Sequence, residues 1–422
     1  MSQKEIEDLF SFIAECPTAF HVVDAVRKQL TANGFLELEE QECWKVHPGG
    51  KYFVVRNESS LISFALPKQE IFGFHMAASH TDSPAFKVKV NPEISENSYV
   101  KLNTEKYGGM ILSTWLDRPL SVAGRVFFED ADGEIEQRLV HIDRDLLVIP
   151  NLAIHMNREI NQGFSYNPQV DMLPIFSDKK GKTLLSLVAE EAGIDQKEIL
   201  SDDLFVYVRQ KGCFIGENGQ WILSPRLDDL ECVYASMQGL LVSKPQHFIA
   251  LSAFFDNEEV GSSTKQGADS TFLEQVIVRI AESLSLPDDE ARRLLAKSFL
   301  ISADNAHAIH PNHPEKADPT NRPKMNGGIV LKYHGGQKYT TDGYSGAYFS
   351  KLCRDAGVAY QTYCGRSDIA GGSTLGNIST AHVSVPSVDI GFAQLAMHSA
   401  VETAGAKDLA QGIKLFRHYW SK

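Results

Sequence analysis

The chain has 422 residues, enough for two or three domains at about 150 residues each. Its 54 acidic and 41 basic residues give a formal net charge of −13, which argues against a nucleic-acid partner because phosphate backbones attract basic surfaces. No apolar run reaches the roughly 18 residues that span a bilayer, and the N-terminus lacks the basic leader and apolar core of an export signal. Six scattered cysteines without Cys-x-x-Cys spacing predict reduced thiols. We therefore expect a cytoplasmic protein without a membrane partner.

Two amphipathic helices are predicted at the start of the chain. Apolar residues recur there at helical spacing in two stretches, first Ile6, Leu9, Phe10 and Ile13, and then Val22, Val23, Val26 and Leu30. Both stretches are typical of helices that pack one face against a core.

Short apolar runs that end in polar clusters follow, at 71–74, 248–255, 299–301 and 388–390, and helical patterns at 272–284 and 288–297 separate the later runs. This alternation predicts an α/β fold with a mostly parallel sheet and helices on both faces. Between residues 88 and 221 the pattern changes to short strands, among them 87–90, 124–128 and 204–208, with turn-rich connections. We expect a catalytic domain formed by residues 1–87 and 222–422, interrupted by an inserted β-rich domain at 88–221.

Acidic residues and histidines follow several of the predicted strands. His80, with Asp82 two residues later, suits a metal ligand whose second ring nitrogen is held by a carboxylate. Glu258 and Glu259 are adjacent carboxylates, of which one can bind metal while the other acts as a base. Two further acids and a late histidine complete the candidates: Asp228, Asp304 and His398. Each motif alone is more typical of a cap, a turn or a core histidine.

As a set, these candidates offer three carboxylates and two imidazoles, from Asp228, Glu259, Asp304, His80 and His398. That inventory suits two zinc ions that share one carboxylate, and manganese or cobalt could substitute. A water between the metals would have its pKa lowered toward neutrality, and Glu258 would take its proton and pass it to the leaving amine. The residues therefore predict a two-metal hydrolase.

Six segments carry a resemblance to a known family, and they occur in this order: ASHTDSP (78–84), NLAIHMNR (151–158), SPRLD (224–228), DNEEVGS (256–262), SAD with HAIHP (302–311) and QLAMHS (394–399). They resemble the aspartyl aminopeptidase family, the family-18 metallopeptidases, and in particular its bacterial branch. The resemblance covers nearly the whole chain. It implies a zinc peptidase that removes the first residue from peptides with a free N-terminus.

The resemblance also implies roles for the matched residues. Asp228 would bridge the two zinc ions. His80 and Asp304 would bind one ion, and Glu259 and His398 would bind the other. Asp82 would orient His80, and Glu258 would be the general base.

One histidine of the predicted insert also matches the family. His155 corresponds to a histidine that acts either as a metal ligand or as a substrate contact reaching into a neighbouring subunit, and its place in the insert favours the second role. A core histidine is the alternative. The family further implies a homo-oligomer, a dodecameric shell of dimers in which the insert forms subunit contacts.

The resemblance implies a preference for Asp or Glu as the first substrate residue. Lys332 matches the basic pocket residue of the family and would pair with a substrate carboxylate, whereas an exposed strand lysine is the alternative. Arg366 and His307 are the other candidate substrate contacts. In the loop at 366–377, Gly371 and Asn377 stand where the family commonly has Cys and Pro, so the pocket shape departs from the family pattern.

Two alternatives remain open. A related two-metal carboxypeptidase or aminoacylase would use the same chemistry, since the metal ligands do not fix which end of the substrate is read. A non-catalytic shell or cargo-binding protein would have no need of Glu258 beside Glu259. Recognition of a free amine distinguishes the first alternative, and metal-dependent hydrolysis distinguishes the second.

Overall fold

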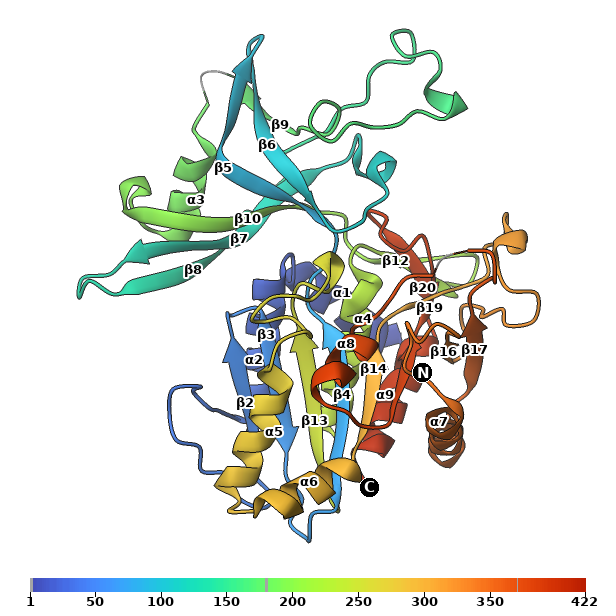
Figure 1. Cartoon of the computed structure of the whole chain (residues 1–422). Coiled ribbons are helices and arrows are strands. Elements are labelled where there is room, and N and C mark those ends of the chain that lie inside the picture. The colour runs from blue at the N-terminus through green and yellow to red at the C-terminus, as the bar shows by residue number, and fades with distance from the viewer. Residues whose placement is uncertain (1–2, 179–180, 370) are drawn as a thin grey trace.

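The structure is a computed structural model that describes residues 3–178, 181–369 and 371–422. Within these ranges the strands form three sheets, of nine, six and five strands. Figure 1 shows two bodies, with the nine-stranded sheet and its helices below and the six-stranded sheet standing above them. The five-stranded sheet lies beside the upper end of the large sheet.

The large sheet is mostly parallel, which confirms the fold class predicted from the sequence. Strands β13, β4, β14 and β18 are parallel neighbours, and the antiparallel pairs are β2 with β3, β3 with β13, and β18 with β16. Strand β13 is almost wholly apolar because helices cover both faces of the sheet. The order is β1 (Leu36–Glu37), β2 (Lys51–Arg56), β3 (Ser60–Ala65), β13 (Phe248–Phe255), β4 (Gly73–His80), β14 (Phe299–Ala303), β18 (Ser387–Gly391), β16 (Ile329–Tyr333) and β17 (Tyr360–Cys364).

Two hydrophobic layers hold helices on the two faces of this sheet. Successive residues of a strand point to opposite faces, so Phe254 lies in one layer and Phe255 in the other. The first layer contains α1 (Gln3–Glu15), α2 (Ala19–Ala32), α4 (Leu227–Leu241), α7 (Gly343–Ala356) and α9 (Asp408–Tyr419). The second contains α5 (Phe272–Ser283), α6 (Asp288–Ala296) and α8 (Leu375–His382). The helices predicted at the start of the chain and near residues 272–297 are confirmed.

The six-stranded sheet is antiparallel throughout and has its own core. Its order is β8 (Ile135–His141), β7 (Leu120–Glu129), β10 (Ile199–Val208), β5 (Ala85–Glu96), β6 (Tyr99–Tyr107) and β9 (Ile175–Asp178). Helix α3 (Leu184–Ala192) packs on it around a cluster that includes Trp115, Leu120 and Leu204. The strands predicted at 87–90, 124–128 and 204–208 all belong to this sheet.

The five-stranded sheet has no counterpart in the sequence-based prediction. Its strands are β11 (Cys213–Ile215), β12 (Trp221–Ser224), β20 (Glu402–Gly405), β19 (Ala393–Leu395) and β15 (Ala306–His307). Such short strands show too few residues for a period of two to be recognised. The sheet matters because it joins the segment before Asp228 to the segments on either side of His398.

Arg125 of β7 connects the six-stranded sheet to the large body. Its guanidinium donates to the backbone oxygen of Asn57 at 2.7 Å and lies 4.0 Å from the centre of the Phe20 ring. Asp203 of β10 holds the same guanidinium in an ion pair at 3.0 Å. The two bodies therefore share a buried, directional contact in addition to their covalent connections.

All six cysteines are free thiols, in agreement with the sequence-based prediction, although Cys43 and Cys213 are exposed. Among the described helices, none combines the length and the apolar character that a membrane crossing requires.

Helix α9 is fixed to the centre of the large sheet by a buried tyrosine. The Tyr419 hydroxyl donates to the backbone oxygen of Phe299 at 2.7 Å and lies 3.2 Å from that of Met76, on the neighbouring strands β14 and β4.

We predict that Tyr419→Phe lowers the free energy of unfolding by about 1–3 kcal/mol, because it leaves buried carbonyl groups without this donor. Urea denaturation measures the change. The control Tyr344→Phe removes a hydroxyl from a side chain that is 68% exposed, and it should stay within about 0.5 kcal/mol of wild type. Equal stability of the two variants would contradict the assigned contact.

Candidate metal centre

The predicted ligands meet at the carboxyl ends of the central parallel strands. His80 is the last residue of β4, Asp304 directly follows β14, and Glu258 and Glu259 lie in a short 3-10 helix (Glu258–Val260) after β13. Asp228 lies at the start of α4, close to these strand ends. This edge is where parallel α/β sheets bind their ligands, because the loops after each strand converge there.

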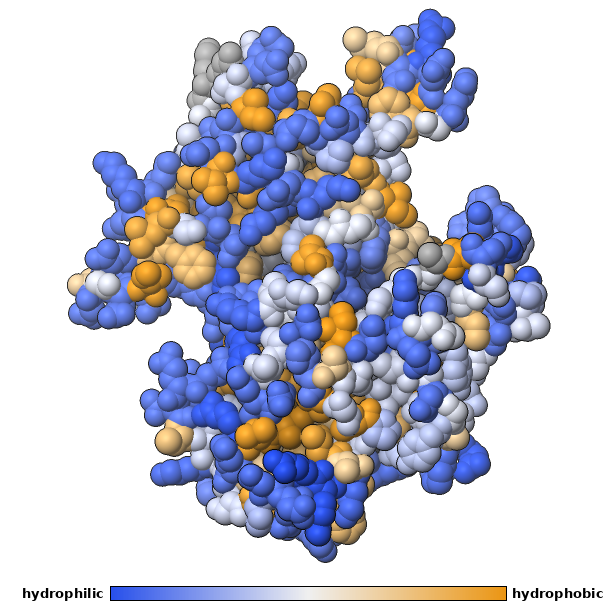
Figure 2. Space-filling view, viewed as in Figure 1, coloured by the Kyte–Doolittle hydropathy of each residue, from blue (hydrophilic) through white to orange (hydrophobic). Residues whose placement is uncertain are grey.

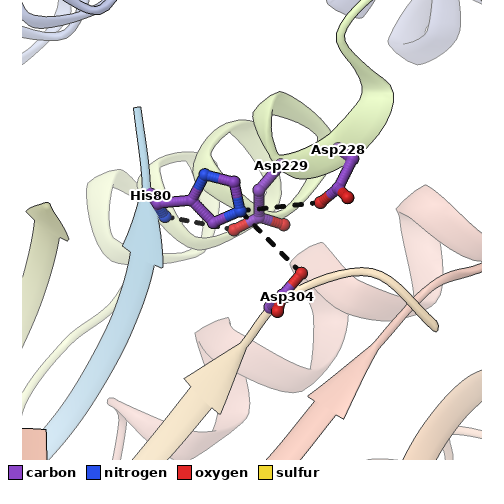
Figure 3. Close-up of side chains that lie close together, drawn as sticks. All are labelled: His80, Asp228, Asp229 and Asp304. Atoms are coloured by element: carbon purple, nitrogen blue, oxygen red, sulfur yellow. Dashed lines mark hydrogen bonds and ion pairs between the residues drawn. The ribbon is translucent and has the colours of Figure 1, made fainter. Parts of the chain in front are cut away.

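One group of ligand atoms gathers around His80. Its Nε2 atom lies 3.6 Å from Oδ1 of Asp228 and 3.9 Å from Oδ1 of Asp304. Figure 3 shows these side chains pointing toward one another, with Asp229 beside them. Asp229 accepts a hydrogen bond from the backbone N–H of His80 at 3.1 Å. The four residues each offer a ligand atom within 4.8 Å of the others, close enough to surround one ion.

A second group gathers around His398, which follows β19. Its Nε2 atom lies 3.4 Å from Oδ2 of Asp228 and 3.4 Å from Oε1 of Glu259. The two oxygens of Asp228 therefore face two different histidines. A carboxylate placed in this way can bridge two cations, each of which would also contact one imidazole.

Both histidine rings are oriented by an oxygen at their other nitrogen. Nδ1 of His80 lies 3.0 Å from the backbone oxygen of Asp82 and 3.4 Å from its carboxylate, and Nδ1 of His398 lies 2.6 Å from the backbone oxygen of Gly109. These acceptors favour the tautomer that carries its proton on Nδ1. The Nε2 lone pair of each ring is then free to face a metal ion.

The Asp82 carboxylate also holds the loop that carries Glu258. It accepts hydrogen bonds from the backbone N–H groups of Glu258 and Glu259, both at 3.1 Å, and from the Tyr107 hydroxyl at 2.7 Å. Asp82 therefore contacts His80 mainly through its backbone oxygen, while its side chain positions the two glutamates.

The electrostatics of the cluster are dominated by buried carboxylates. Burial raises the pKa of Glu258 to about 7, and the charges of Asp304, Asp82 and Asp228 act in the same direction, against the effect of His80. Burial also raises the pKa of Glu259 well above its usual value. So many acids in one place make the ionised state costly unless positive charge is present.

The two histidines supply part of that positive charge in the metal-free chain. Burial by itself lowers the pKa of His398, but its interactions with Asp228 and Glu259 outweigh burial and raise it to about 10. Burial likewise opposes ionisation of Asp228, yet its contacts with the His398 and His80 rings lower its pKa below the usual value.

Several buried oxygens support a cation as the missing partner. In the described part of the chain, Oδ1 of Asp228, Oδ1 of Asp229 and Oε1 of Glu259 are buried and accept no hydrogen bond. A buried carboxylate oxygen without a partner is costly, and native structures seldom retain one. Imidazole nitrogens with carboxylate oxygens form a donor set that zinc commonly takes, so the residues present fit the metal.

The structure contradicts the alternative that Lys332 is an exposed strand lysine. Its side chain is 2% exposed, and its Nζ atom donates to the backbone oxygen of Asn305 at 3.1 Å and lies 3.8 Å from Oδ2 of Asp304. Burial by itself lowers the pKa of Lys332, but the charge of Asp304 helps to raise it above the usual value. Lys332 therefore stays cationic beside Asp304.

The remaining predicted residues lie at different distances from the cluster. His307 lies on β15, which begins soon after Asp304, and its side chain is exposed. Arg366 pairs with Asp368 through two hydrogen bonds of 2.7 and 2.8 Å. His155 is exposed on the long loop between β8 and β9. As far as the chain is described, neither Arg366 nor His155 forms a hydrogen bond or ion pair with the predicted metal ligands.

The sequence-based reasoning missed three residues of the site. Glu402 on β20 is buried and accepts hydrogen bonds from the backbone N–H groups of Asp228 at 2.9 Å and His398 at 2.7 Å. Asp229 and Tyr107 are the other two. The acidic pair at 228–229 was a signal for Asp229, but nothing in the sequence marks Glu402 or Tyr107, because their contacts come from other sheets.

Comparisons with known proteins identify the family of the chain. The family model described as aminopeptidase I zinc metalloprotease (M18) matches residues 12–420. The chain belongs to this family. The chain is 48% identical to a probable M18 family aminopeptidase 2 of Clostridium novyi (strain NT), over 99% of each chain.

Solved structures are similar over almost the full length as well. In the complex of Ape4 and Nbr1, the matching chain has a TM-score of 0.93 and 36% identity, over 98% of this chain and 85% of that one. In the mApe1 dodecamer of S. cerevisiae, the values are 0.86 and 28%, over 98% and 95%. The family and its named relatives make this protein a metallo-aminopeptidase, a hydrolase that acts on peptides.

Proposed function

We propose that this aminopeptidase binds two zinc ions and uses Glu258 as the general base that removes the N-terminal residue of a peptide. The observation that carries the proposal is the placement of Asp228, whose two carboxylate oxygens face His80 and His398 separately. His80 and Asp304 would hold one ion, and Glu259 and His398 would hold the other. Manganese or cobalt could replace zinc, since both accept the same nitrogen and oxygen ligands.

The bound zinc ions would lower the pKa of a water molecule and polarise the carbonyl of the scissile peptide bond. Glu258 would take the proton of that water and return it to the leaving amine. Its surroundings suit this work. Burial brings its pKa to about 7, and Asp82 fixes its backbone through the N–H groups of both glutamates. A base whose pKa lies near the working pH can both accept and release a proton.

We further propose that the enzyme prefers Asp or Glu as the first residue. Support comes from the positive charge near the cluster, where Lys332 is cationic and its Nζ atom lies 3.8 Å from Oδ2 of Asp304. Because Lys332 is buried, it would act through its charge, whereas His307 would approach the substrate more directly. Arg366 would contribute only if its pairing with Asp368 gave way to a substrate carboxylate.

We also propose a cytoplasmic homo-oligomer in which the insert, placed at residues 88–221, forms subunit contacts and His155 reaches a neighbouring active site. The loop that bears His155 exposes apolar side chains: Leu152 (55%), Ile154 (49%), Met156 (74%), Phe164 (40%) and Val170 (69%). Figure 2 shows hydrophobic groups on this upper body among many hydrophilic ones. Exposed apolar groups gathered in this way are typical of protein contacts. A dodecamer, the assembly named for mApe1 of S. cerevisiae, is the proposed state.

We predict that Glu258→Gln lowers kcat by about 10²–10⁴-fold while zinc remains bound, because glutamine keeps the shape but cannot accept the proton. Steady-state kinetics and metal analysis on the same preparation measure both effects. The control Glu290→Gln changes an exposed glutamate on α6 and should leave kcat unchanged. Wild-type kcat in Glu258→Gln with full zinc content would contradict the assigned base.

The wild-type pH profile tests the same assignment. Glu258 must be ionised to act, so kcat/KM should fall as pH drops through its pKa, which is about 7 without metal and lower when the cations are bound.

The substrate end is tested with matched peptides that carry either a free or an acetylated N-terminus and differ in their first residue. We expect cleavage of the free peptides only, and faster cleavage when the first residue is Asp or Glu. Product analysis by mass spectrometry identifies which bond is cut. Cleavage of acetylated peptides would favour the aminoacylase or carboxypeptidase alternative, and equal rates for Asp, Glu, Leu and Lys would contradict the acidic preference.

A further inference from the structure

The segment 107–111 leaves strand β6 of the six-stranded sheet and contacts Asp82, beside the first group of predicted metal ligands, and two members of the second group. It begins at Tyr107, the last residue of β6, and ends at Ile111, directly before a short 3-10 helix (Leu112–Trp115). Its contacts join the six-stranded sheet to the candidate metal centre of the large body.

The first contact is made by the Tyr107 side chain. Its hydroxyl donates to the Asp82 carboxylate at 2.7 Å and accepts a hydrogen bond from Nδ2 of Asn257 at 2.8 Å. Asp82 in turn receives the backbone N–H groups of Glu258 and Glu259. The Tyr107 hydroxyl therefore completes a hydrogen-bonded loop around the base, through Asp82 on one side and Asn257 on the other.

The Tyr107 ring has a separate structural role. It packs edge-on against Phe205 of β10, with 5.5 Å between ring centres. Removal of the hydroxyl alone therefore leaves the packing of the ring in place and isolates the effect of the two hydrogen bonds.

The second contact is made by the backbone at Gly109 and Ile111. The Gly109 oxygen lies 2.6 Å from Nδ1 of His398, and the Ile111 N–H donates to the backbone oxygen of His398 at 3.0 Å. These two bonds hold the His398 ring and its backbone together. The orientation of this ligand therefore depends on the segment from the other sheet.

Gly108 explains how the segment comes so close to Glu259. Its φ is +80°, a conformation that side chains disfavour, and a Cβ atom there would lie 3.1 Å from Cβ and 3.3 Å from Oε2 of Glu259. Any larger residue would press on this ligand. The segment thus meets Asp82 beside the first group, and Glu259 and His398 in the second group.

We propose that Tyr107 is a positioning residue for the reaction, and that segment 107–111 makes the six-stranded sheet part of the catalytic apparatus of its own subunit. The inference rests on the proposed two-zinc function. Tyr107 limits the motion of Asp82 and of the loop that carries Glu258, so that the base keeps a productive geometry. Gly108 and Gly109 place Glu259 and His398 for the second ion.

The test compares Tyr107→Phe in the full chain with Tyr99→Phe. Tyr99 lies on the same strand but is 56% exposed, so the control removes a hydroxyl from the same sheet. Tyr107→Phe should lower kcat, zinc affinity or both by about 10–100-fold, as loss of a partner that orients ligands typically does, with KM unchanged. Zinc affinity is measured by competition with a chromophoric chelator. Loss of the two hydrogen bonds should also lower the melting temperature of the metal-free protein below that of the control. A purely structural role would produce that shift alone and leave kcat and zinc affinity of the folded protein at the control values.

A second pair of variants tests the backbone part of the proposal. Gly108→Ala adds a side chain against Glu259, whereas Gly34→Ala adds one at the same φ of +80° with no atom within 4 Å. Both variants should show the same backbone strain, and only Gly108→Ala should lose affinity for one of the two zinc ions.

Wild-type kcat and zinc affinity in Tyr107→Phe would overturn the inference, as would equal zinc binding by the two glycine variants. Failure of the underlying function has a different signature. If the wild type binds a single zinc ion, or if Glu258→Gln keeps full activity, the two-zinc proposal fails irrespective of how Tyr107→Phe behaves.

Discussion

The structure depends on one electrostatic constraint, an excess of buried carboxylates at the carboxyl edge of the large sheet. Asp228, Asp229 and Asp304 lie there with Glu258 and Glu259, and in the described part of the chain two histidines and a buried lysine provide positive charge beside them. Burial of so many like charges is unfavourable unless cations neutralise them. The oxygens of Asp228 and Glu259 that accept no hydrogen bond are the groups that such cations would neutralise. The arrangement of the carboxylates and histidines therefore suits the binding of cations that neutralise these charges.

The fold satisfies the constraint by fixing each ligand from a different direction. Parallel pairing sets His80 opposite Phe255, so the loop after β13 begins beside the first histidine. The five-stranded sheet brings Glu402 to the backbone of Asp228 and His398. The six-stranded sheet adds Tyr107 and Gly109. Three sheets therefore converge on one cluster, and the apolar layers on both faces of the large sheet keep it rigid enough to hold them.

The sequence predicted those elements and site residues that are marked by a hydrophobic pattern or by a characteristic residue type. Continuous apolar runs such as 248–255 predicted buried parallel strands, and the polar residues just after them predicted where ligands would meet. His80, Asp304 and Glu259 could be found in this way because each ends a strand, directly follows one or lies in the loop after one. The acidic pair at 228–229 drew attention to Asp228, while the family resemblance supplied its role.

The sequence did not predict features that depend on packing between elements far apart in the chain. Strands of two to four residues, such as β15 and β20, carry no recognisable period, so the five-stranded sheet and Glu402 were missed. The sequence around Tyr107 is typical of a strand, and only the folded structure shows that its hydroxyl contacts Asp82. The burial of Lys332 was also undetermined, because a lysine in a short strand is usually exposed, and here Asp304 and Asn305 compensate for its charge. The roles of His155 and Arg366 remain predictions.

The most direct test of the central claim is crystallographic. Crystals of the zinc-loaded enzyme, measured on both sides of the zinc absorption edge, would locate each ion without reference to activity. The account predicts two anomalous peaks about 3.5–4 Å apart, one on each side of the Asp228 carboxylate, the first beside His80 and Asp304 and the second beside His398 and Glu259. A single peak, or two peaks of which one does not contact Asp228, would contradict it.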